Sequence, residues 1–507
     1  MKLFQSPQFL FLFLPLVWVG FIVLHRRSGL HSALTFLVAA SAFFYAWHTP
    51  HYLLIITASI CVNFMIGRRL TGRNGRFLLG CGIAFNLGML VVFKYADFLV
   101  ENLNVFRAEN LPLPAFVLPL AISFYTFQQI AYLIDVSRGH KSVTSFLRYA
   151  FFVGFFPQLI AGPIVHHHEI LPQLNRLSPN ARRVVVNLCI GLTIFVLGLA
   201  KKLLIADNVG EIADDVFDKA GPGNIPTFFD CWYGALAFTF QIYFDFSGYS
   251  DMAIGLGRIF GIRLPLNFYS PYKAPSIIEF WRRWHITLSR FLRDYLYFSL
   301  GGNRRGPLRR HANILIVMLL GGLWHGAAWA FILWGGLHGI YIVVNHIWRR
   351  FRFPCSGHRV YKFAAWALTF TAVVIAWVPF RVNDLGTALA VYYEMTGPNG
   401  LNLGFSRYLS VGDWRTLLLN IGFEYHNGVW SLSVRFWLMV SAFVSFFTPN
   451  IYEWMRRQDT VWRMHGRQNL SGLNWSPSPA IALLIGGLGV LAVVYQSRPV
   501  EFLYFQF

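Results

Sequence analysis

Long apolar runs separated by short polar loops dominate this chain. Four such runs lie at residues 7–24, 30–47, 52–66 and 77–93. The last apolar run of the chain lies at residues 480–496. A helix of about 20 apolar residues spans the hydrocarbon core of a bilayer. The first run exceeds the apolar core of a signal peptide and lacks a small-residue cleavage site, so it is predicted to be a retained span. The pattern predicts an all-α, polytopic integral membrane protein with about 11–13 membrane helices, including re-entrant segments.

Composition and charge agree with a membrane protein. Hydrophobic residues make up 56% of the 507-residue chain, charged residues only 13%, and the formal net charge is +21. In a soluble protein this excess would suggest a nucleic-acid partner. Here the basic residues lie in short loops, as in Arg26–Arg27 and Arg68–Arg69, which indicates cytoplasmic loops and contact with anionic lipid. This topology places both termini outside and makes the acidic segment 382–430 extracytoplasmic.

Two interior segments depart from a simple spanning helix. Residues 146–164 end in Phe-Pro-Gln-Leu-Ile-Ala-Gly-Pro, which predicts a broken helix or a re-entrant turn covered by protein or water. The span at 184–200 is followed by Lys201 and Lys202, which are predicted to close it.

The sequence predicts no metal centre. The five cysteines show no spacing typical of metal ligands. His166, His167 and His168 could indicate a metal, but adjacent residues of one helix or strand cannot all converge on one ion. A solvated loop is predicted there.

The stretch from Phe280 to His338 contains the main candidate chemistry. His325 lies in Ile314–Val344, which contains no Lys, Arg, Asp or Glu. Polar groups in hydrocarbon are costly and usually functional, and histidine suits proton transfer near neutral pH. Because basic clusters flank both ends of the apolar run 313–347, the run is predicted to turn back within the membrane, at Gly335 and Gly336. A core histidine that is only hydrogen-bonded is the alternative.

Residues 276–296 are predicted to form one amphipathic helix. Glu279 with Arg283, and Arg290 with Asp294, are spaced to pair along its polar side. The opposite stripe carries His285 together with Trp281, Leu288 and Leu292. We therefore expect His285 to point toward the apolar interior.

Two carboxylates lie in the run 228–262. Asp245 and Asp251 are predicted to accept hydrogen bonds from backbone or arginine donors near a water-filled cavity. The glycines around them are typical of closely packed membrane helices.

Five segments together resemble the membrane-bound O-acyltransferase (MBOAT) family, in its bacterial branch typified by the alginate O-acetyltransferase membrane subunit. The resemblance covers most of the chain, which is expected to form a single MBOAT-like domain over residues 1–507. The segments that carry it are Ile122–Phe127, Pro157–Pro163, Tyr243–Ala253, Glu279–His285 and Gly322–Gly326.

The resemblance implies the site. His325 matches the catalytic histidine of the family and His285 its second polar position, both in a central tunnel through the membrane. Trp324, Trp281, Asp245 and Asp251 are then candidates to line or support the tunnel.

The resemblance also implies the reaction. The expected donor is acetyl-coenzyme A from the cytosol, with no bound cofactor, and the expected acceptor is an extracytoplasmic polysaccharide such as alginate or acetylated cellulose. The C-terminal aromatic hexapeptide, residues 502–507, resembles a motif whose tyrosine, here Tyr504, is thought to relay the acyl group. A periplasmic acetyltransferase partner and a bacterial inner-membrane location follow from the same resemblance.

Other functions stay open on the sequence. Within the family, the acceptor could instead be peptidoglycan, or D-alanine could be transferred to teichoic acid. A proton-coupled transporter could use Asp245, Asp251 and the histidines as a relay, although the pseudo-symmetric halves typical of transporters are not seen. A structural scaffold would leave the polar hairpin unexplained.

Overall fold

The computed structural model describes most of the chain, and within the described ranges every regular element is a helix. The prediction of an all-α fold is therefore confirmed. The described residues are 4–47, 50–72, 74–107, 110–218, 220, 226–351, 358–382, 384–398, 432–462, 474–495 and 503.

The N-terminal half begins with long membrane helices, continues with shorter, buried ones and ends with a further long helical segment, Ala181–Phe217. The long helices are α1 (Leu14–Arg27), α2 (Gly29–Ala46), α3 (Pro50–Arg69) and α4 (Gly75–Leu90), which continues through a π-helical turn, η2 (Val91–Tyr95), into α5 (Ala96–Asn104). They are followed by α6 (Ile122–Ser137), α7 (Phe146–Gly154), α8 (Phe156–Leu159), α9 (His167–Leu174), α10 (Ala181–Ala200), the π-helical η3 (Lys201–Ala206) and α11 (Asp207–Phe217).

The C-terminal half holds the longest helix and the hairpin that carries His325. It contains α12 (Phe228–Ile259), the short η4 (Pro271–Lys273), α13 (Ile277–Arg283), α14 (Ile286–Phe291), the π-helical η5 (Leu292–Tyr297), α15 (Gly306–His325), α16 (Trp329–Trp348), α17 (Arg359–Val382), α18 (Leu385–Glu394), α20 (Leu432–Phe447), α21 (Ile451–Trp454) and α22 (Pro479–Val494).

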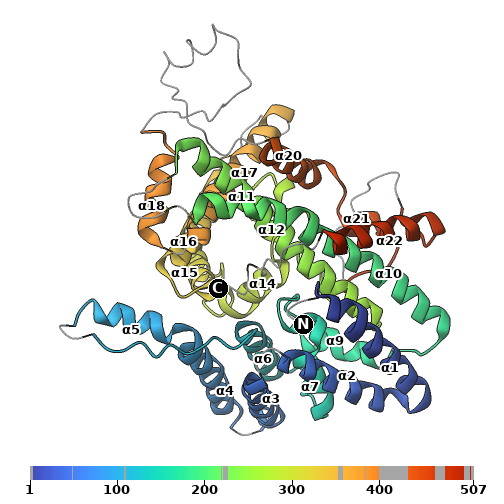
Figure 1. The fold of residues 1–507 in the computed structure, drawn as a ribbon. Coiled ribbons are helices and arrows are strands. Elements are labelled where there is room, and N and C mark those ends of the chain that lie inside the picture. Colours follow the sequence, from blue (N-terminus) through green and yellow to red (C-terminus); the bar gives the residue numbers. More distant parts are fainter. Residues whose placement is uncertain are drawn as a thin grey trace.

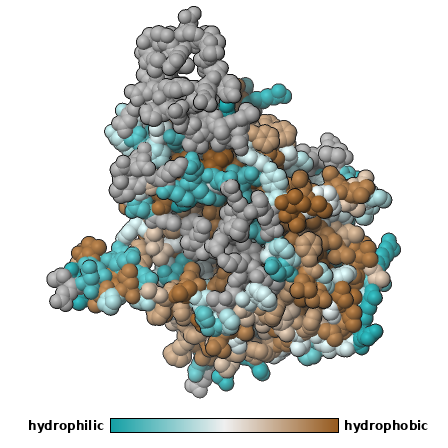
Figure 2. Space-filling model, in the orientation of Figure 1, coloured by the Kyte–Doolittle hydropathy of each residue, from teal (hydrophilic) through white to brown (hydrophobic). Residues whose placement is uncertain are grey.

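Seven helical segments of the described chain are long and apolar enough to cross a membrane, from Phe9–Arg27 to Arg359–Val382. Large apolar side chains are exposed on these segments and on the shorter apolar helix Pro479–Val494; they include Leu54, Leu368 and Leu483, each more than 70% exposed. Figure 2 shows hydrophobic residues over much of the face that contains α1, α2 and α22. Such surface is stable against lipid and not against water, so the chain is a multi-pass membrane protein.

Helix α12 forms the centre of the fold. It packs along α10 and α11 and also contacts α17 and α20 (Figure 1). Small residues allow this approach, because a Cβ on Gly198 of α10 would lie 2.6 Å from the carbonyl oxygen of Gly248 on α12. The glycines of α12 therefore have the packing role that the sequence predicts.

The structure confirms one predicted break and moves another. The break in 146–164 is present, because α7 ends at Gly154 and α8 begins at Phe156. The hairpin in 313–347 is also present, but its turn lies at residues 326–328. The predicted turn at Gly335 and Gly336 is wrong, since both glycines lie inside α16.

Lysines 201 and 202 do not end a span. The helix continues from α10 through η3 into α11, and the Lys202 side chain is buried, with 3% of its surface exposed. Its Nζ lies 2.6 Å from Asp207 and 2.6 Å from Asp245. Two carboxylates compensate the buried ammonium, so the apolar run need not stop there.

The predicted amphipathic helix 276–296 is broken. Glu279 and Arg283 pair at 2.8 Å as expected, but α13 stops before Trp284, and α14 starts only at Ile286. Arg290 does not pair with Asp294. It instead pairs with Glu169 of α9 at 2.7 Å, because the break turns that side of α14 toward α9.

The extracytoplasmic segment predicted over 382–430 is described only in part. Helix α18 occupies its beginning, and residues 399–430 lie outside the described residues.

Candidate active site

His325 is the last residue of α15, at the tip of the α15–α16 hairpin. Gly326 is extended, and α16 begins at Trp329. The two helices approach closely through glycine, because a Cβ on Gly322 would lie 2.2 Å from the Phe331 carbonyl oxygen. This approach fixes the tip inside the protein.

The His325 side chain lies in an aromatic environment and is 4% exposed. Its ring centroid lies 4.8 Å from Trp324, 5.0 Å from Trp334 and 5.1 Å from Phe380. Aromatic side chains therefore enclose the imidazole, whose ring nitrogen can accept a proton as a general base does.

Two side chains of η2 support the hairpin tip. Lys94 Nζ donates to the carbonyl oxygens of Trp324 (2.6 Å) and His325 (3.0 Å), and the Tyr95 hydroxyl donates to Leu323 O (3.0 Å). These carbonyls end α15 and have no partner within the helix, so a cation is favourable there. Sequence analysis missed Lys94, although a single lysine at the end of the run 77–93 was a usable signal.

His285 lies in the break between α13 and α14 and is fully buried. Its backbone is left-handed (φ 41°), which turns the side chain inward. Asn267 Oδ1 accepts from the Thr287 hydroxyl at 2.9 Å and faces His285 Nδ1 at 3.1 Å. Because Oδ1 is an acceptor, Nδ1 carries the proton and Nε2 carries the lone pair.

Trp324 connects the two histidines. Its ring adjoins His325 and lies 6.1 Å from His285, and its other side packs on Phe124 and Phe127 of α6. His285 is also close enough to His325 to interact with it electrostatically. The structure therefore brings together the two histidines that the sequence predicts as catalytic.

A cavity of about 100 Å³ reaches His325. Lys94, Trp324 and the segment 118–124 also line it. In the predicted topology, this segment lies at the outer side of α6. A small polar group could therefore approach His325 from that side.

His338 is a buried histidine that sequence analysis did not select. It lies in α16, and neither ring nitrogen has a hydrogen-bond partner in the described residues. Its ring stacks parallel to Phe280 at 6.0 Å and meets Trp281 at 5.2 Å and Trp334 at 4.9 Å. Trp281 thus belongs to an aromatic layer next to the His325 environment. The signal was a second histidine in the same uncharged run.

Asp245 and Asp251 lie in buried ion pairs on α12. Asp251 accepts from Lys201 Nζ and from the Tyr452 hydroxyl, each at 2.7 Å. Asp245 pairs with Lys202 and accepts from the backbone N–H of Leu503 at 3.1 Å. The expected backbone donor is present, but lysines and a tyrosine replace the expected arginines.

The C-terminal hexapeptide is described at one residue. Leu503 is 5% exposed, and its contact with Asp245 places it against α12. Tyr504 lies outside the described residues.

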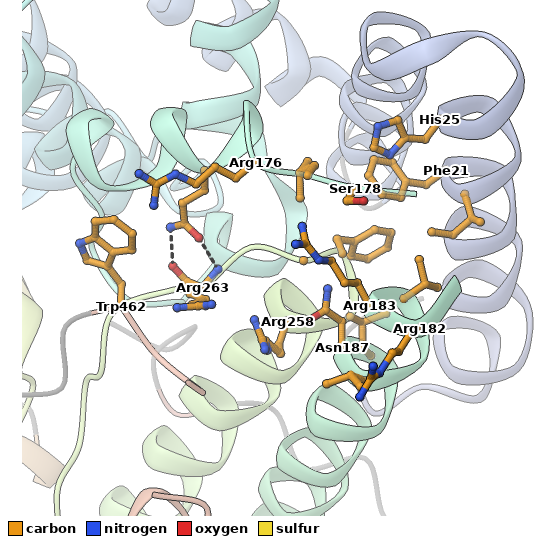
Figure 3. Close-up of a pocket in the computed structure, with 18 residues that line it drawn as sticks. Phe21, His25, Arg176, Ser178, Arg182, Arg183, Asn187, Arg258, Arg263 and Trp462 are labelled. Carbon is orange, nitrogen blue, oxygen red and sulfur yellow. Dashed lines mark hydrogen bonds between the residues drawn. The ribbon is translucent and has the colours of Figure 1, made fainter. Parts of the chain in front are cut away.

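A separate basic cavity of about 640 Å³ lies between α1, α10 and the C-terminal end of α12 (Figure 3). Among the described residues, no acidic side chain lines it. None of its lining residues belongs to the hairpin or to α14, so it is not part of the histidine site. Its basic residues are His25, Arg176, Arg182, Arg183, Arg258 and Arg263.

Comparisons with known proteins agree with this geometry. A family model described as MBOAT, membrane-bound O-acyltransferase family, matches residues 133–379. "Probable alginate O-acetylase AlgI" of Pseudomonas putida is 38% identical over 520 residues, covering 99% of this chain and 100% of the relative. The chain belongs to the membrane-bound O-acyltransferase family.

Two further relatives show the range of this family. "Peptidoglycan O-acetyltransferase" of Helicobacter pylori is 44% identical over 439 residues, covering 79% of this chain and 81% of the relative. "Teichoic acid D-alanyltransferase" of Streptococcus thermophilus is 28% identical over 293 residues, covering 52% and 69%. This MBOAT protein is therefore an acyltransferase enzyme, and membership of the family decides against the transporter alternative.

Proposed function

We propose that this enzyme transfers an acetyl group from cytosolic acetyl-coenzyme A toward hydroxyl groups of an extracytoplasmic polysaccharide. The observation that carries the proposal is the pair of buried histidines on either side of Trp324, with a cavity at His325. The alginate O-acetylase relatives, which match over most of the chain, support a polysaccharide acceptor.

In this proposal His325 is the general base. The acceptor hydroxyl transfers its proton to the imidazole as its oxygen attacks the thioester carbonyl carbon. The tetrahedral intermediate then collapses: the carbon–sulfur bond breaks, the ester remains on the acceptor, and the imidazolium returns the proton to the departing thiolate. Such a base contributes on the order of 10²–10⁴-fold to the rate.

His285 is proposed to orient the acyl group and to stabilise the developing negative charge. Asn267 fixes the orientation of its ring through Nδ1. The opposite nitrogen then needs either a proton or a bridging water to act as a donor toward an oxyanion. In this role, Asn267 sets the orientation of the ring, and the proton or water at Nε2 is the donor.

The first acceptor is proposed to be Tyr504. Its phenol oxygen would take the acetyl group at the outer side, and a periplasmic acetyltransferase partner would transfer that group to the polymer. A phenyl ester is a good acyl donor. The contact of Leu503 with Asp245, which places the preceding residue against α12, supports the approach of this segment.

The proposed location is the bacterial inner membrane, with both termini periplasmic. The positive loops support this orientation. Acetyl-coenzyme A is a substrate in this scheme, and no bound cofactor or nucleic acid takes part.

His325→Ala tests the base. Polymer-bound acetyl ester should fall by about 10²–10⁴-fold, while the variant accumulates in membranes like the wild type. His358→Ala, which removes an exposed histidine, is the control. Wild-type acetyl content in His325→Ala cells would contradict the proposed mechanism.

Tyr504→Phe tests the relay with the same readout. It removes only the phenol oxygen, so transfer to the polymer should stop while the histidine site stays intact. Full activity of this variant would show that the segment is an interfacial anchor.

Peptidoglycan is the second candidate acceptor, because the peptidoglycan O-acetyltransferase of Helicobacter pylori is 44% identical to this chain. Separate measurement of base-labile acetyl in purified peptidoglycan and in exopolysaccharide distinguishes the two. A loss confined to peptidoglycan in His325→Ala would select this candidate. D-alanine transfer to teichoic acid, the activity named for a third relative, would instead be detected as released D-alanine.

A further inference from the structure

A second histidine cluster surrounds one carboxylate at the cytoplasmic end of α6. Asp135 is 5% exposed and lies in the last turn of this helix. Its Oδ2 atom faces three imidazole nitrogens, the Nδ1 atoms of His166 (3.4 Å), His168 (3.5 Å) and His167 (4.0 Å). The prediction of a solvated loop at these histidines is wrong, since His166 and His167 are each 5% exposed.

The backbone explains how adjacent histidines converge. His166 is extended (φ −105°, ψ 145°), and His167 starts the helix α9. The change from extended to helical geometry turns the side chains at 166 and 168 to the same side. Adjacent residues within one regular helix or strand cannot all reach one ion, but His166 and His168 lie on either side of a change in backbone geometry.

The separations from Asp135 Oδ2 to His166 and His168 suit a bound ion better than direct hydrogen bonds to this oxygen. An N–H···O hydrogen bond measures about 2.7–3.2 Å, and among the described residues Asp135 Oδ2 has no hydrogen-bond partner. Two ligands about 2.0–2.2 Å from a tetrahedral zinc ion lie about 3.3–3.5 Å apart. The separations from Oδ2 to His166 and His168 have this value.

The remaining features of a metal site are also present. Tyr295 of η5 donates to the second carboxylate oxygen, Asp135 Oδ1, at 2.6 Å and so orients the carboxylate. Among the described residues, His167 Nδ1 has no hydrogen-bond partner, so this nitrogen is available as a ligand. A cavity of about 460 Å³, lined by His140, His167 and His168, gives access to the cluster.

We propose that Asp135, His166 and His168 bind a divalent first-row transition ion such as Zn²⁺, with His167 or water in the fourth position. Imidazole and carboxylate ligands favour this class of ion over Mg²⁺ or Ca²⁺. The inference does not rest on the proposed acyl transfer.

The ion would join three elements near the catalytic segment. Asp135 belongs to α6, the histidines belong to α9, and Tyr295 lies on η5, which directly continues α14. Arg290 and Glu169 already connect α14 to α9 at 2.7 Å. Because His285 precedes α14, metal binding would hold in place the segment that positions His285.

Without an ion, the same atoms can form a proton chain. His166 Nδ1, 3.0 Å from the Tyr295 hydroxyl, would then donate to it, and Tyr295 would donate to Asp135. Bound metal distinguishes the two arrangements.

The test uses the full-length protein, purified in detergent on an affinity tag without histidine, incubated with Zn²⁺ and desalted. Elemental analysis should find about one zinc per chain. The double variant His166→Ala/His168→Ala and the single variant Asp135→Asn should each retain at least about tenfold less zinc than the wild type. His31→Ala/His358→Ala, which removes two exposed histidines elsewhere, should bind like the wild type.

A measurement on the wild type alone covers the case in which the variants fail to fold. After chelation and removal of the chelator, Co²⁺ should give the intense visible bands of a tetrahedral site, and Zn²⁺ should abolish them. Monodisperse wild-type protein that retains no zinc and gives no such bands would overturn the proposal. Equal zinc in the wild type and the folded double variant would also overturn it.

Discussion

Two histidine clusters of this MBOAT protein contain the same side chain in opposite environments. The membrane-interior cluster, His285, His325 and His338, lies among tryptophan and phenylalanine rings. The Asp135 cluster, His166, His167 and His168, surrounds the Asp135 carboxylate.

The two environments suit the histidines to different chemistry. A carboxylate stabilises positive charge, whether as an imidazolium or as a metal ion, which supports the proposed cation site at Asp135. Aromatic rings supply no such carboxylate, which supports the proposed role of the membrane-interior imidazoles as groups that accept a proton during a reaction. In these two proposals, proximity to a carboxylate separates cation binding from base catalysis.

The largest effects are expected when variants of both clusters are measured for both acyl transfer and zinc content. His325→Ala should lower acyl transfer by about 10²–10⁴-fold and leave the zinc content unchanged. His166→Ala/His168→Ala should lose zinc and keep measurable transfer. Transfer is measured with isotopically labelled acetyl-coenzyme A and membranes, and zinc by elemental analysis. If the single variant and the double variant each lower acyl transfer and zinc content equally, the clusters are one functional unit.

The next effect concerns the division of work inside the membrane-interior cluster. His285→Ala should reduce transfer by about 10²–10³-fold, as expected for the loss of one group that stabilises an oxyanion. Asn267→Ala should reduce it less, because the imidazole remains but loses the Nδ1 contact that orients it. The same labelled-acetyl assay measures both. A larger loss for Asn267→Ala than for His285→Ala would contradict the positioning role.

A smaller effect concerns the Asp135 cluster. Tyr295→Phe removes the hydroxyl that donates to Asp135 Oδ1. Loss of such an orienting contact typically weakens metal binding about 10–100-fold. Competition with a chromogenic chelator gives the affinity. Unchanged affinity would mean that the carboxylate is held by other contacts.

The smallest effect concerns the hairpin that carries His325 and His338. A Cβ on Gly335 would lie 2.2 Å from the Met318 carbonyl oxygen, whereas on Gly336 it would lie 3.5 Å from a Leu319 methyl carbon. Gly335→Ala should therefore lower stability by about 1–3 kcal/mol, and the matched Gly336→Ala should change it little. Thermal unfolding in detergent measures both. Zinc binding should be retained, and equal melting temperatures for the two variants would show that the helices can separate at no cost.

Much of this molecule follows from the order of its side chains. The apolar runs predict the helices, because a bilayer requires backbone groups to be paired within each span. The uncharged surroundings of His325 and the inward stripe of His285 predict that both are buried, and both are. Lys94 and His338 were visible as isolated polar residues in apolar runs, but nothing in the pattern related them to His325.

Tertiary structure alone decided how these pieces meet. The hairpin turns at 326–328 because glycine at 322 and 335 allows close backbone contact across the helices, which a hydropathy pattern does not record. Lys202 stays buried within a helix because Asp245 from α12 compensates its charge. The three adjacent histidines converge on Asp135 because the backbone changes from extended to helical between His166 and His167. The helix contact and the Lys202–Asp245 pair join residues that are remote in sequence, and the His166 conformation is a local backbone torsion. Neither follows from the order of apolar and polar residues.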